Sequence, residues 1–361
     1  MNSFPDGRAI VYCEGAFGTP NGKTAHGLVR RTRRYHVLSV IDSRHAGRDA
    51  GEVLDGKPCG IPVCGGVERA IREAEAVSGP ASHLVIGLAP DGGRLSGDAR
   101  AAVLHAITQG LHVDSGLHDF LSEDPEISRL ALENSVRIRD VRKPPPLNKL
   151  HFFSGKIEEV DSLRIALLGT DSAVGKRTTA WLLVDALEAA GHSAELIGTG
   201  QTAWMQGVRY GIILDSIVND FVAGEIENAI WNCWKGSAPQ VMVLEGQGSL
   251  MNPAYPGGME LLAAGRPHAI ILQHAPARKH YDGFPKHPMH SLEKQILAVE
   301  TLSEKPVLAI TINHENLTPH QVREECRRIR EKTGLPASDV LLNGASELVN
   351  LVTPLIQRIN A

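Results

Sequence analysis

The sequence has little net charge, few cysteines and no long apolar run. Its 361 residues carry a net charge of −4 with both signs spread along the chain, which argues against a general nucleic-acid or membrane-surface binder. No apolar run approaches the ~18 residues that span a bilayer. The five cysteines show no close CxxC spacing and no leader segment precedes Arg8, so we expect a soluble, cytoplasmic protein.

The composition is that of a globular protein with more than one core. Apolar residues make up 42% and charged residues 22%, and a chain of this length favours two domains. The clearest break is "VRKPPPLNK" (141–149), because consecutive prolines fit neither a helix nor a central strand. We predict a first domain over 1–143, a proline-rich connector over 144–155 and a second domain over 156–361.

In the first domain, apolar runs alternate with helix-like segments. We expect strands within 8–15, 35–42, 83–90 and 110–116, and helices within 23–34, 66–77 and 97–110. This alternation predicts a parallel α/β sheet of Rossmann-like type. The glycine-rich stretch 87–103 is either an anion-binding turn or a plain turn. Its lack of GxGxxG spacing favours the plain turn. "GTPNGKT" (18–24) lacks the upstream glycine of a phosphate loop.

The second domain opens with a strand, a glycine-containing loop and a helix, the context of a phosphate loop. The apolar strand "LRIALLG" leads into "GTDSAVGKRTT" (169–179), spaced G-x5-G-K-x-T, and a helix follows to a glycine stop at 191. We therefore predict a P-loop NTPase-like parallel-sheet domain. The predicted cofactor-binding loop comprises Gly169, Thr170, Asp171, Ser172, Ala173, Val174, Gly175, Lys176, Arg177, Thr178 and Thr179.

Arg177 stands where most such loops have a magnesium-binding Ser or Thr. A cation in the first turn of a helix opposes the helix dipole, so an anion is expected nearby. Arg can grip phosphate oxygens but cannot ligate magnesium, while Thr178 and Thr179 can donate hydroxyl hydrogen bonds. The loop is therefore better suited to hold a phosphate than to cleave one. Alternatively, Arg177 pairs with a neighbouring carboxylate.

Polar residues follow the other predicted strands of this domain. Because ligands sit at the carboxyl ends of parallel strands, we expect these residues to gather near Lys176. They are Thr199, Gln201, Thr202, Glu245, Gln247, Ser249, His274, Arg278, Tyr281 and Asn313. Taken singly, each has a structural explanation, such as a satisfied core histidine or a capping carboxylate.

An acidic segment begins at 207, and its apolar spacing predicts one helix or two short ones. Its carboxylates are either a solvated face or functional groups. In the second case Asp215 or Asp220 binds the ammonium of an amino-acid substrate or takes its proton.

These motifs carry two resemblances. "GTDSAVGK", "VLEGQGS" and "ITIN" resemble the phosphate loop, acidic strand end and base-contacting Asn (here Asn313) of dethiobiotin synthetase, over the second domain only. Nearly the whole chain resembles a two-domain family of formerly unknown function, with a Rossmann-like half and a P-loop half. The shared stretches are "GTDSAVGKRTT", "GTGQT", "DSIVNDFVAGEIE" and "EGQGSLMNPAYPG".

The second resemblance implies an N-acetyltransferase, since the family's characterised member acetylates D-glutamate with acetyl-CoA. Coenzyme A has phosphates to be gripped without hydrolysis, which suits Arg177 and requires no metal. We expect the base among Asp220, Glu245 and His274, and a cation for the substrate carboxylates in Arg278 or Arg209. The expected substrate-holding residues are Thr199, Gln201, Thr202, Asp215, Gln247, Ser249 and Arg278. The expected partner is a small amino acid, with no nucleic acid or membrane, and the chain is expected to form a homo-oligomer.

Two other classes of function stay open. An ATP- and Mg-dependent ligase or kinase acting on a small carboxylate or amino acid is favoured by the dethiobiotin synthetase resemblance. Glu245 at a Walker-B-like position and Asp171 within the loop also favour it, and Thr178 would then reach magnesium in place of residue 177. A nucleotide-binding regulatory protein without catalysis is the third class.

Overall fold

The computed structural model describes residues 4–359 and divides into two compact units. The division falls between Pro144 and Pro145, inside the proline run. One later segment, Gln201–Val208, groups with the first unit although the sequence places it in the second domain. Within the described residues, none of the helices combines the length and the apolar character needed to cross a lipid bilayer.

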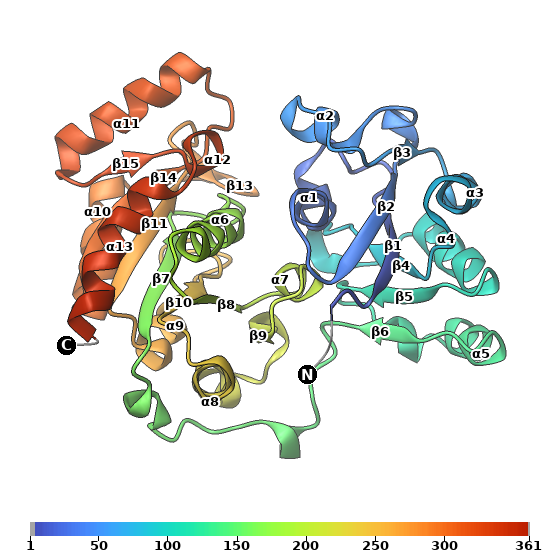
Figure 1. The fold of residues 1–361 in the computed structure, drawn as a ribbon, viewed down its shortest axis with the longest axis horizontal. Helices are drawn as coiled ribbons and strands as arrows, with labels where there is room; N and C mark the ends of the chain where they lie inside the picture. The colour runs from blue at the N-terminus through green and yellow to red at the C-terminus, as the bar shows by residue number, and fades with distance from the viewer. Residues whose placement is uncertain (1–3, 360–361) are drawn as a thin grey trace. The chain divides into compact units, whose positions relative to one another are not determined.

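The first unit is a parallel sheet in the order β3-β2-β1-β4-β5-β6, the order of a Rossmann-like fold (Figure 1). Its strands are β1 Gly7–Tyr12, β2 Tyr35–Ile41, β3 Val63–Cys64, β4 His83–Ile86, β5 His112–Ser115 and β6 Ile138–Asp140. Its helices are α1 Lys23–Arg30, α2 Ala50–Asp55, α3 Val67–Ser78, α4 Gly97–Thr108, α5 Pro125–Glu133 and α7 Gln201–Met205.

All four strands and three helices predicted for this unit are confirmed, and the alternation correctly indicated a parallel α/β sheet. Five strands and α-helices described in this unit were missed, one of them α7. The strands β3 and β6 are two and three residues long, too short for a pattern to form. The helix α2 has only six residues, and α5 starts at Pro125 behind the capping carboxylate of Asp124.

The second unit is a parallel seven-stranded sheet in the order β15-β14-β11-β7-β10-β8-β9. Its strands are β7 Leu163–Gly169, β8 Ala194–Gly198, β9 Tyr210–Gly211, β10 Val241–Glu245, β11 Ala269–His274, β14 Val307–Ile312 and β15 Ala337–Ser338. A separate antiparallel hairpin joins β12 His280–Tyr281 to β13 Phe284–Pro288. The central position of β7, with every residue buried, fixes where the loop after it begins.

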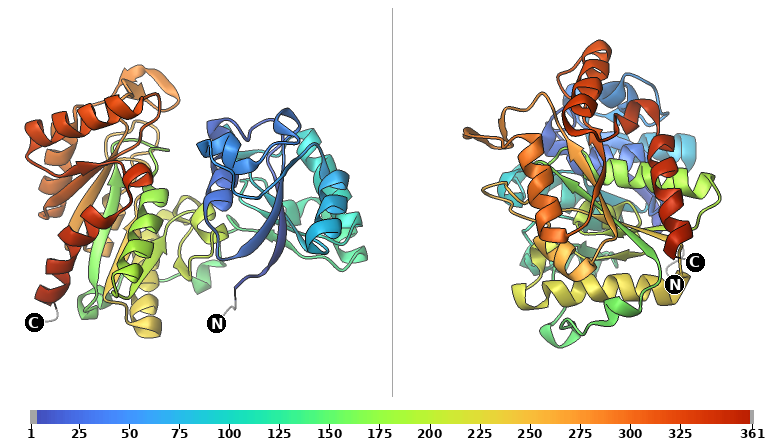
Figure 2. Two further views of the ribbon diagram at one scale, coloured as in Figure 1. Left: turned by 45° about the horizontal axis from the view of Figure 1, so that its top comes forward. Right: turned by 90° about the vertical axis from the view of Figure 1, so that its left-hand side faces the viewer.

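Helices cover both faces of this sheet (Figure 2, right). They are α6 Lys176–Ala189, α8 Asn219–Ser237, α9 Met259–Gly265, α10 Leu292–Ser303, α11 Pro319–Thr333, α12 Val340–Asn343 and α13 Ser346–Ile359. The helix α6 packs with α12 and α13, while α8 packs with α9, and α9 with α10. The predicted acidic helix is one long helix, α8, preceded by a 3-10 turn at Leu214–Ser216.

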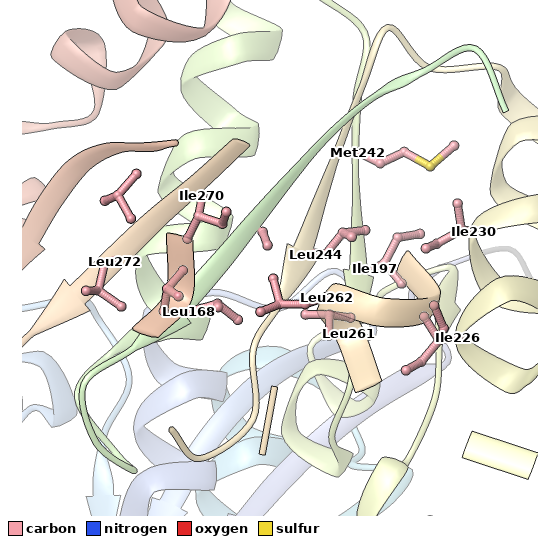
Figure 3. Packing of buried hydrophobic residues seen from close by; sticks show 14 of the residues in the cluster. Leu168, Ile197, Ile226, Ile230, Met242, Leu244, Leu261, Leu262, Ile270 and Leu272 are labelled. Atoms are coloured by element: carbon pink, nitrogen blue, oxygen red, sulfur yellow. The ribbon is translucent and has the colours of Figure 1, made fainter. Parts of the chain in front are cut away.

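Apolar side chains of α8 and α9 pack onto the sheet, as Figure 3 shows. Leu168 of β7 and Leu244 of β10 face Ile226 of α8 and Leu262 of α9 in one buried cluster. Burying one such side chain contributes about 1.5–3 kcal/mol. The cluster holds the strands rigidly, so the residues beyond their carboxyl ends keep defined positions.

The helix α7 is fastened to the first unit. Thr202 shares a hydrogen bond with Thr24 over 2.8 Å between their hydroxyl oxygens. The Arg34 guanidinium lies 3.7 Å from the Trp204 ring centroid, and its Nε donates to the Trp204 carbonyl at 2.7 Å. Gln206 donates through Nε2 to the Gly27 carbonyl at 2.8 Å. These contacts explain why this segment leaves the unit that its neighbours in sequence belong to.

Candidate functional site

The candidate site is the loop that joins β7 to α6. Glycine is required at both ends of it. At Gly169 a side chain would stand 2.9 Å from Nζ of Lys176, and Gly175 has a φ of +104°, in the left-handed region. The strand therefore turns directly into the helix, with Lys176 folded back across the loop.

Lys176 is buried and holds the loop from within. Its Nζ donates to the carbonyl of Asp171 at 2.8 Å and to the carbonyl of Gly248, after β10, at 2.7 Å. The ammonium therefore lies between the loop and the neighbouring strand end.

Asp171 anchors the loop to three other segments. Its fully buried carboxylate accepts from Nδ2 of Asn252 at 2.7 Å, from Nη1 of Arg278 at 2.9 Å and from the amide of Asp282 at 2.9 Å. It also accepts from the amide of Ser172 at 2.7 Å. The carboxylate is saturated with donors, so Asp171 acts here as a structural anchor.

Arg278 supports the loop from outside. Its Nη1 donates to the carbonyl of Ser172 at 2.7 Å and Nη2 to the carbonyl of Ala173 at 3.3 Å. Ion pairs with Asp171 and Glu315 raise its pKa despite burial. The guanidinium predicted for a substrate carboxylate is thus largely occupied in shaping the loop.

With its carbonyls turned to these donors, the loop presents amides. Asn313 completes the set, since its Nδ2 donates to the carbonyl of Val174 at 3.1 Å. Among residues 4–359, none accepts a hydrogen bond from the amides of Ala173, Val174 or Gly175. Consecutive unbonded amides at a helix start, beside a buried ammonium, are the arrangement with which phosphate loops bind phosphate oxygens.

The two threonines of the loop differ. The hydroxyl of Thr179 is buried and donates to Oε1 of Gln273 at 2.6 Å, so it is committed to the interior. Thr311 donates to the same oxygen at 2.5 Å. Thr178 is half-buried, and its hydroxyl has no partner within the described part of the chain. Of the two, Thr178 is the one whose hydroxyl remains available to a ligand.

Glu245, at the end of β10, is enclosed. Its Oε2 accepts from the amide of Thr199 at 3.0 Å, and its carbonyl accepts from the Thr199 hydroxyl at 2.9 Å. Burial raises the pKa of Glu245, while the charge of Arg177 and that of Lys176 act in the opposite direction. The interpretation in which Arg177 has a carboxylate nearby is thus supported alongside the anion interpretation.

His274, at the end of β11, contacts the loop through Thr170. The two side chains share a hydrogen bond of 2.9 Å between Nδ1 and Oγ1. Burial and, to a smaller extent, the nearby charge of Arg328 lower the pKa of His274 to about 4. At neutral pH the imidazole is therefore uncharged, with Nε2 on the side away from Thr170.

The segment after β10 contributes two of the predicted substrate holders. Gln247 donates through Nε2 to the carbonyl of Thr199 at 2.7 Å. Ser249 is buried, and no described residue pairs with its hydroxyl. Both line a cavity of about 10 Å³, which has room for a single water molecule. Such a water would satisfy the Ser249 hydroxyl.

The remaining predicted residues belong to other elements. Gln201 and Thr202 belong to α7 in the first unit. Asp215 and Asp220 are exposed, in the turn before α8 and in its first turn. Arg209 pairs with Glu195 at 3.2 Å. Within residues 4–359 no three His, Cys, Asp or Glu side chains gather as metal ligands would.

Sequence reasoning missed several residues that shape the loop. Gln273 precedes His274 on a strand that was recognised, and its position before a predicted site residue was the only signal. Asn252 lies within the shared stretch "EGQGSLMNPAYPG", farther from the strand end than Gln247 and Ser249, so the expectation for strand ends did not extend to it. Asp282 and Glu315 act on the loop directly or through Arg278, across more than 100 residues of sequence.

In the first unit, the corresponding turn from β1 to α1 has amides that are already hydrogen-bonded within the protein. The amide of Phe17 in the loop after β1 donates to the buried carboxylate of Asp42 at 2.8 Å. In the first turn of α1, the amide of Ala25 donates to the carbonyl of Gly87 at 3.0 Å. The protein's own acceptors therefore occupy amides that a dinucleotide phosphate uses in many Rossmann-like folds.

Comparisons with known proteins agree with this architecture. Residues 151–349 match the P-loop domain of a family described as a domain of unknown function, DUF1611, and residues 43–144 match its Rossmann-like N-terminal domain. A solved DUF1611 family protein from Anabaena variabilis is 29% identical with a TM-score of 0.88, covering 97% of this chain and 100% of that one.

Two curated relatives bear the name D-glutamate N-acetyltransferase. The one from Tritonibacter scottomollicae is 31% identical over 80% of this chain and 87% of its own length. The one from a Pseudoalteromonas species is 29% identical over 76% of this chain and 82% of its own. The family resemblance seen in the motifs is confirmed, and the chain belongs to the DUF1611 family, with a Rossmann-like and a P-loop domain.

Proposed function

We propose that this protein transfers an acetyl group from acetyl-CoA to the amino group of an acidic amino acid, with D-glutamate as the first candidate. The observation that carries the proposal is the name shared by two relatives that are 31% and 29% identical over most of the chain. The P-loop supports it because an acetyl-CoA-dependent enzyme must hold phosphates without splitting them.

The residues of the loop fit the phosphates of coenzyme A. The amides of Ala173, Val174 and Gly175 would receive phosphate oxygens, with Lys176 as the buried counter-charge. Thr178 would add a hydroxyl. Coenzyme A supplies the activated acetyl thioester, and its phosphates need no metal for this role.

The reaction requires a proton acceptor. The substrate ammonium must lose a proton before its nitrogen bonds to the thioester carbon; the C–S bond then breaks, and the thiolate takes up a proton. Of the three expected bases, Asp220 is exposed and Glu245 is enclosed with a raised pKa. His274 contacts the phosphate loop through Thr170, so we assign the proton transfer to it.

The alternative is an ATP- and Mg-dependent ligase or kinase. Glu245 favours it, because this carboxylate follows the strand beside the loop and senses the charges of Arg177 and Lys176. Against it, Asp171 is saturated by protein donors. Arg177 offers no metal ligand.

Thiol release and ligand-induced stabilisation separate the two. With acetyl-CoA and D-glutamate we expect release of free coenzyme A, formation of N-acetylglutamate by mass spectrometry, and a rise in melting temperature with coenzyme A in the absence of metal. The variant Lys176→Ala should lose these signals, while Lys149→Ala, at an exposed site, should keep them. Magnesium-dependent stabilisation by ATP alone, without thiol release for any amino acid, would refute the transferase.

A further inference from the structure

A second cavity of about 320 Å³ lies beside the phosphate loop, within the P-loop unit. It is lined by the end of β11, the segment before β12, the exit of β13, the start of α10 and the later part of α11. Arg278 contacts both the cavity and the loop. The volume suits a small metabolite and is at the lower end of ligand-binding sites.

The charges around this cavity are mainly positive. Besides Arg278, which is engaged with the loop, Lys279, Arg328 and Lys332 line it; Arg328 also forms an ion pair with Glu325 of the same helix, to which its Nε donates at 2.8 Å. Within the described residues Lys279 has no ion-pair partner. One carboxylate, Glu293, lines the cavity, with Lys332 Nζ 3.6 Å away. The pKa of Glu293 is lowered, first by its own backbone amide, so it is ionised at neutral pH.

His274 connects the cavity to the loop. It lines the cavity, is more than nine-tenths buried, and uses Nδ1 for Thr170. Within residues 4–359, no side chain or backbone group bonds to its Nε2. This nitrogen is accessible to solvent, so a ligand bound in the cavity would be able to form a hydrogen bond with it.

We propose that this cavity binds the acceptor amino acid, with its carboxylates held by Lys279, Arg328 and Lys332. Its amino group would lie between Glu293 and Nε2 of His274. The assignment rests on the proposed acetyl transfer and names the acceptor site for it. Several cations and a single carboxylate match the charges of an acidic amino acid, which has two carboxylates and one ammonium.

The same features disfavour the phosphates of the cofactor in this cavity. The Glu293 carboxylate would repel a phosphate group, and the volume is small for a coenzyme A molecule. The phosphate loop already offers unbonded amides for that purpose. The loop and the cavity thus form two adjacent sites, one for each substrate.

Calorimetric titration of the full-length protein with D-glutamate, in the presence of unacetylated coenzyme A, tests the assignment without any reaction. The variant Arg328→Gln should weaken glutamate binding about tenfold or more, because a charge-assisted hydrogen bond is lost. The neighbouring Arg327→Gln is the matched control, since Arg327 is exposed outside the cavity. The Arg327→Gln variant should bind D-glutamate with the affinity of the unchanged protein.

Glutarate, which lacks the amino group, tests the role of Glu293. The variant Glu293→Gln should weaken the binding of D-glutamate about tenfold, because the ammonium of glutamate loses its carboxylate partner. Glutarate has no ammonium, so its binding should stay as tight or become tighter. A parallel loss for both compounds, an equal effect of Arg327→Gln, or no binding to the unchanged protein would overturn the cavity assignment. Thiol release is scored separately. Release without cavity-dependent binding leaves acetyl transfer standing; cavity-dependent binding without release refutes acetyl transfer and leaves an acidic amino acid site.

Discussion

Both units contain a parallel sheet in which a central strand turns through a glycine-containing loop into a helix, yet the two turns are used differently. After β1, the Asp42 carboxylate accepts a hydrogen bond from the amide of Phe17, and the carbonyl of Gly87 accepts one from the amide of Ala25 in the first turn of α1. After β7, Arg278 and Asn313 donate to loop carbonyls, while the amides of residues 173–175 have no acceptor among the described residues. The same topology is therefore either a structural joint or an anion site, depending on which backbone groups the side chains satisfy.

The largest expected effect comes from removing the anchor of the open loop. Asp171→Ala leaves Arg278 buried without one of its two carboxylates and should cost about 3–5 kcal/mol of unfolding free energy. Urea unfolding followed by circular dichroism measures it. The control Asp161→Ala, at an exposed site before β7, should change stability by less than about 0.5 kcal/mol. An equally small effect at Asp171 would show that the loop does not need its anchor.

Acid should lower the stability of both units, but only in the second unit does the protonated histidine contact the glycine-containing loop. Burial lowers the pKa of His83 in the first unit and of His274 in the second to about 4. The unfolded chain binds these protons near pH 6.5, so stability is full above that pH and falls as the pH drops toward 4. Each histidine accounts for up to about 3 kcal/mol. The pH dependence of the unfolding free energy, compared with that of His274→Asn, checks it; an unchanged slope would contradict it.

Removing the buried charge should affect only the open loop. Lys176→Ala is expected to weaken coenzyme A about 100-fold, because an ammonium-to-phosphate contact is lost in a desolvated position. Isothermal titration measures this, with Lys149→Ala as the matched control. A change below threefold would mean that the cofactor phosphates bind elsewhere.

Breaking the closed loop should alter stability and not binding. In Asp42→Asn, one of the carboxylate oxygens that accept from Phe17 and Arg44 becomes a donor, so the first unit should lose about 1–3 kcal/mol. Thermal unfolding measures the loss, while the affinity for coenzyme A should stay within twofold of the unchanged protein. Coenzyme A binding that falls as far as in Lys176→Ala would erase the distinction between the loops.

The smallest expected change is in the relative affinity for ATP and coenzyme A. Arg177→Thr restores a hydroxyl that can ligate magnesium, so ATP with magnesium should gain several-fold in affinity relative to coenzyme A. Competition titrations of the two cofactors give the ratio directly. A ratio that stays the same with and without magnesium would show that Arg177 does not select the cofactor.

Much of the loop was evident from local pattern. A strand at 163–169 followed by Gly175 and Lys176 has the spacing of a phosphate loop, and few other structures require it. The support of the loop was harder to foresee. Arg278 was predicted to meet a substrate, but the structure shows it bonded to Ser172 and Ala173. Which donor satisfies which carbonyl depends on contacts across 100 residues, and no local spacing encodes them.

The sequence by itself determined the two α/β units, the phosphate loop and the family, because alternating apolar runs and glycine positions are local properties. Only the tertiary structure decided that residues 201–208 pack with the first unit, that Asp42 closes the first loop, and that His274 lines a charged cavity beside the second. These depend on which side chains meet after folding, since hydrogen bonds and burial are set by distances in space.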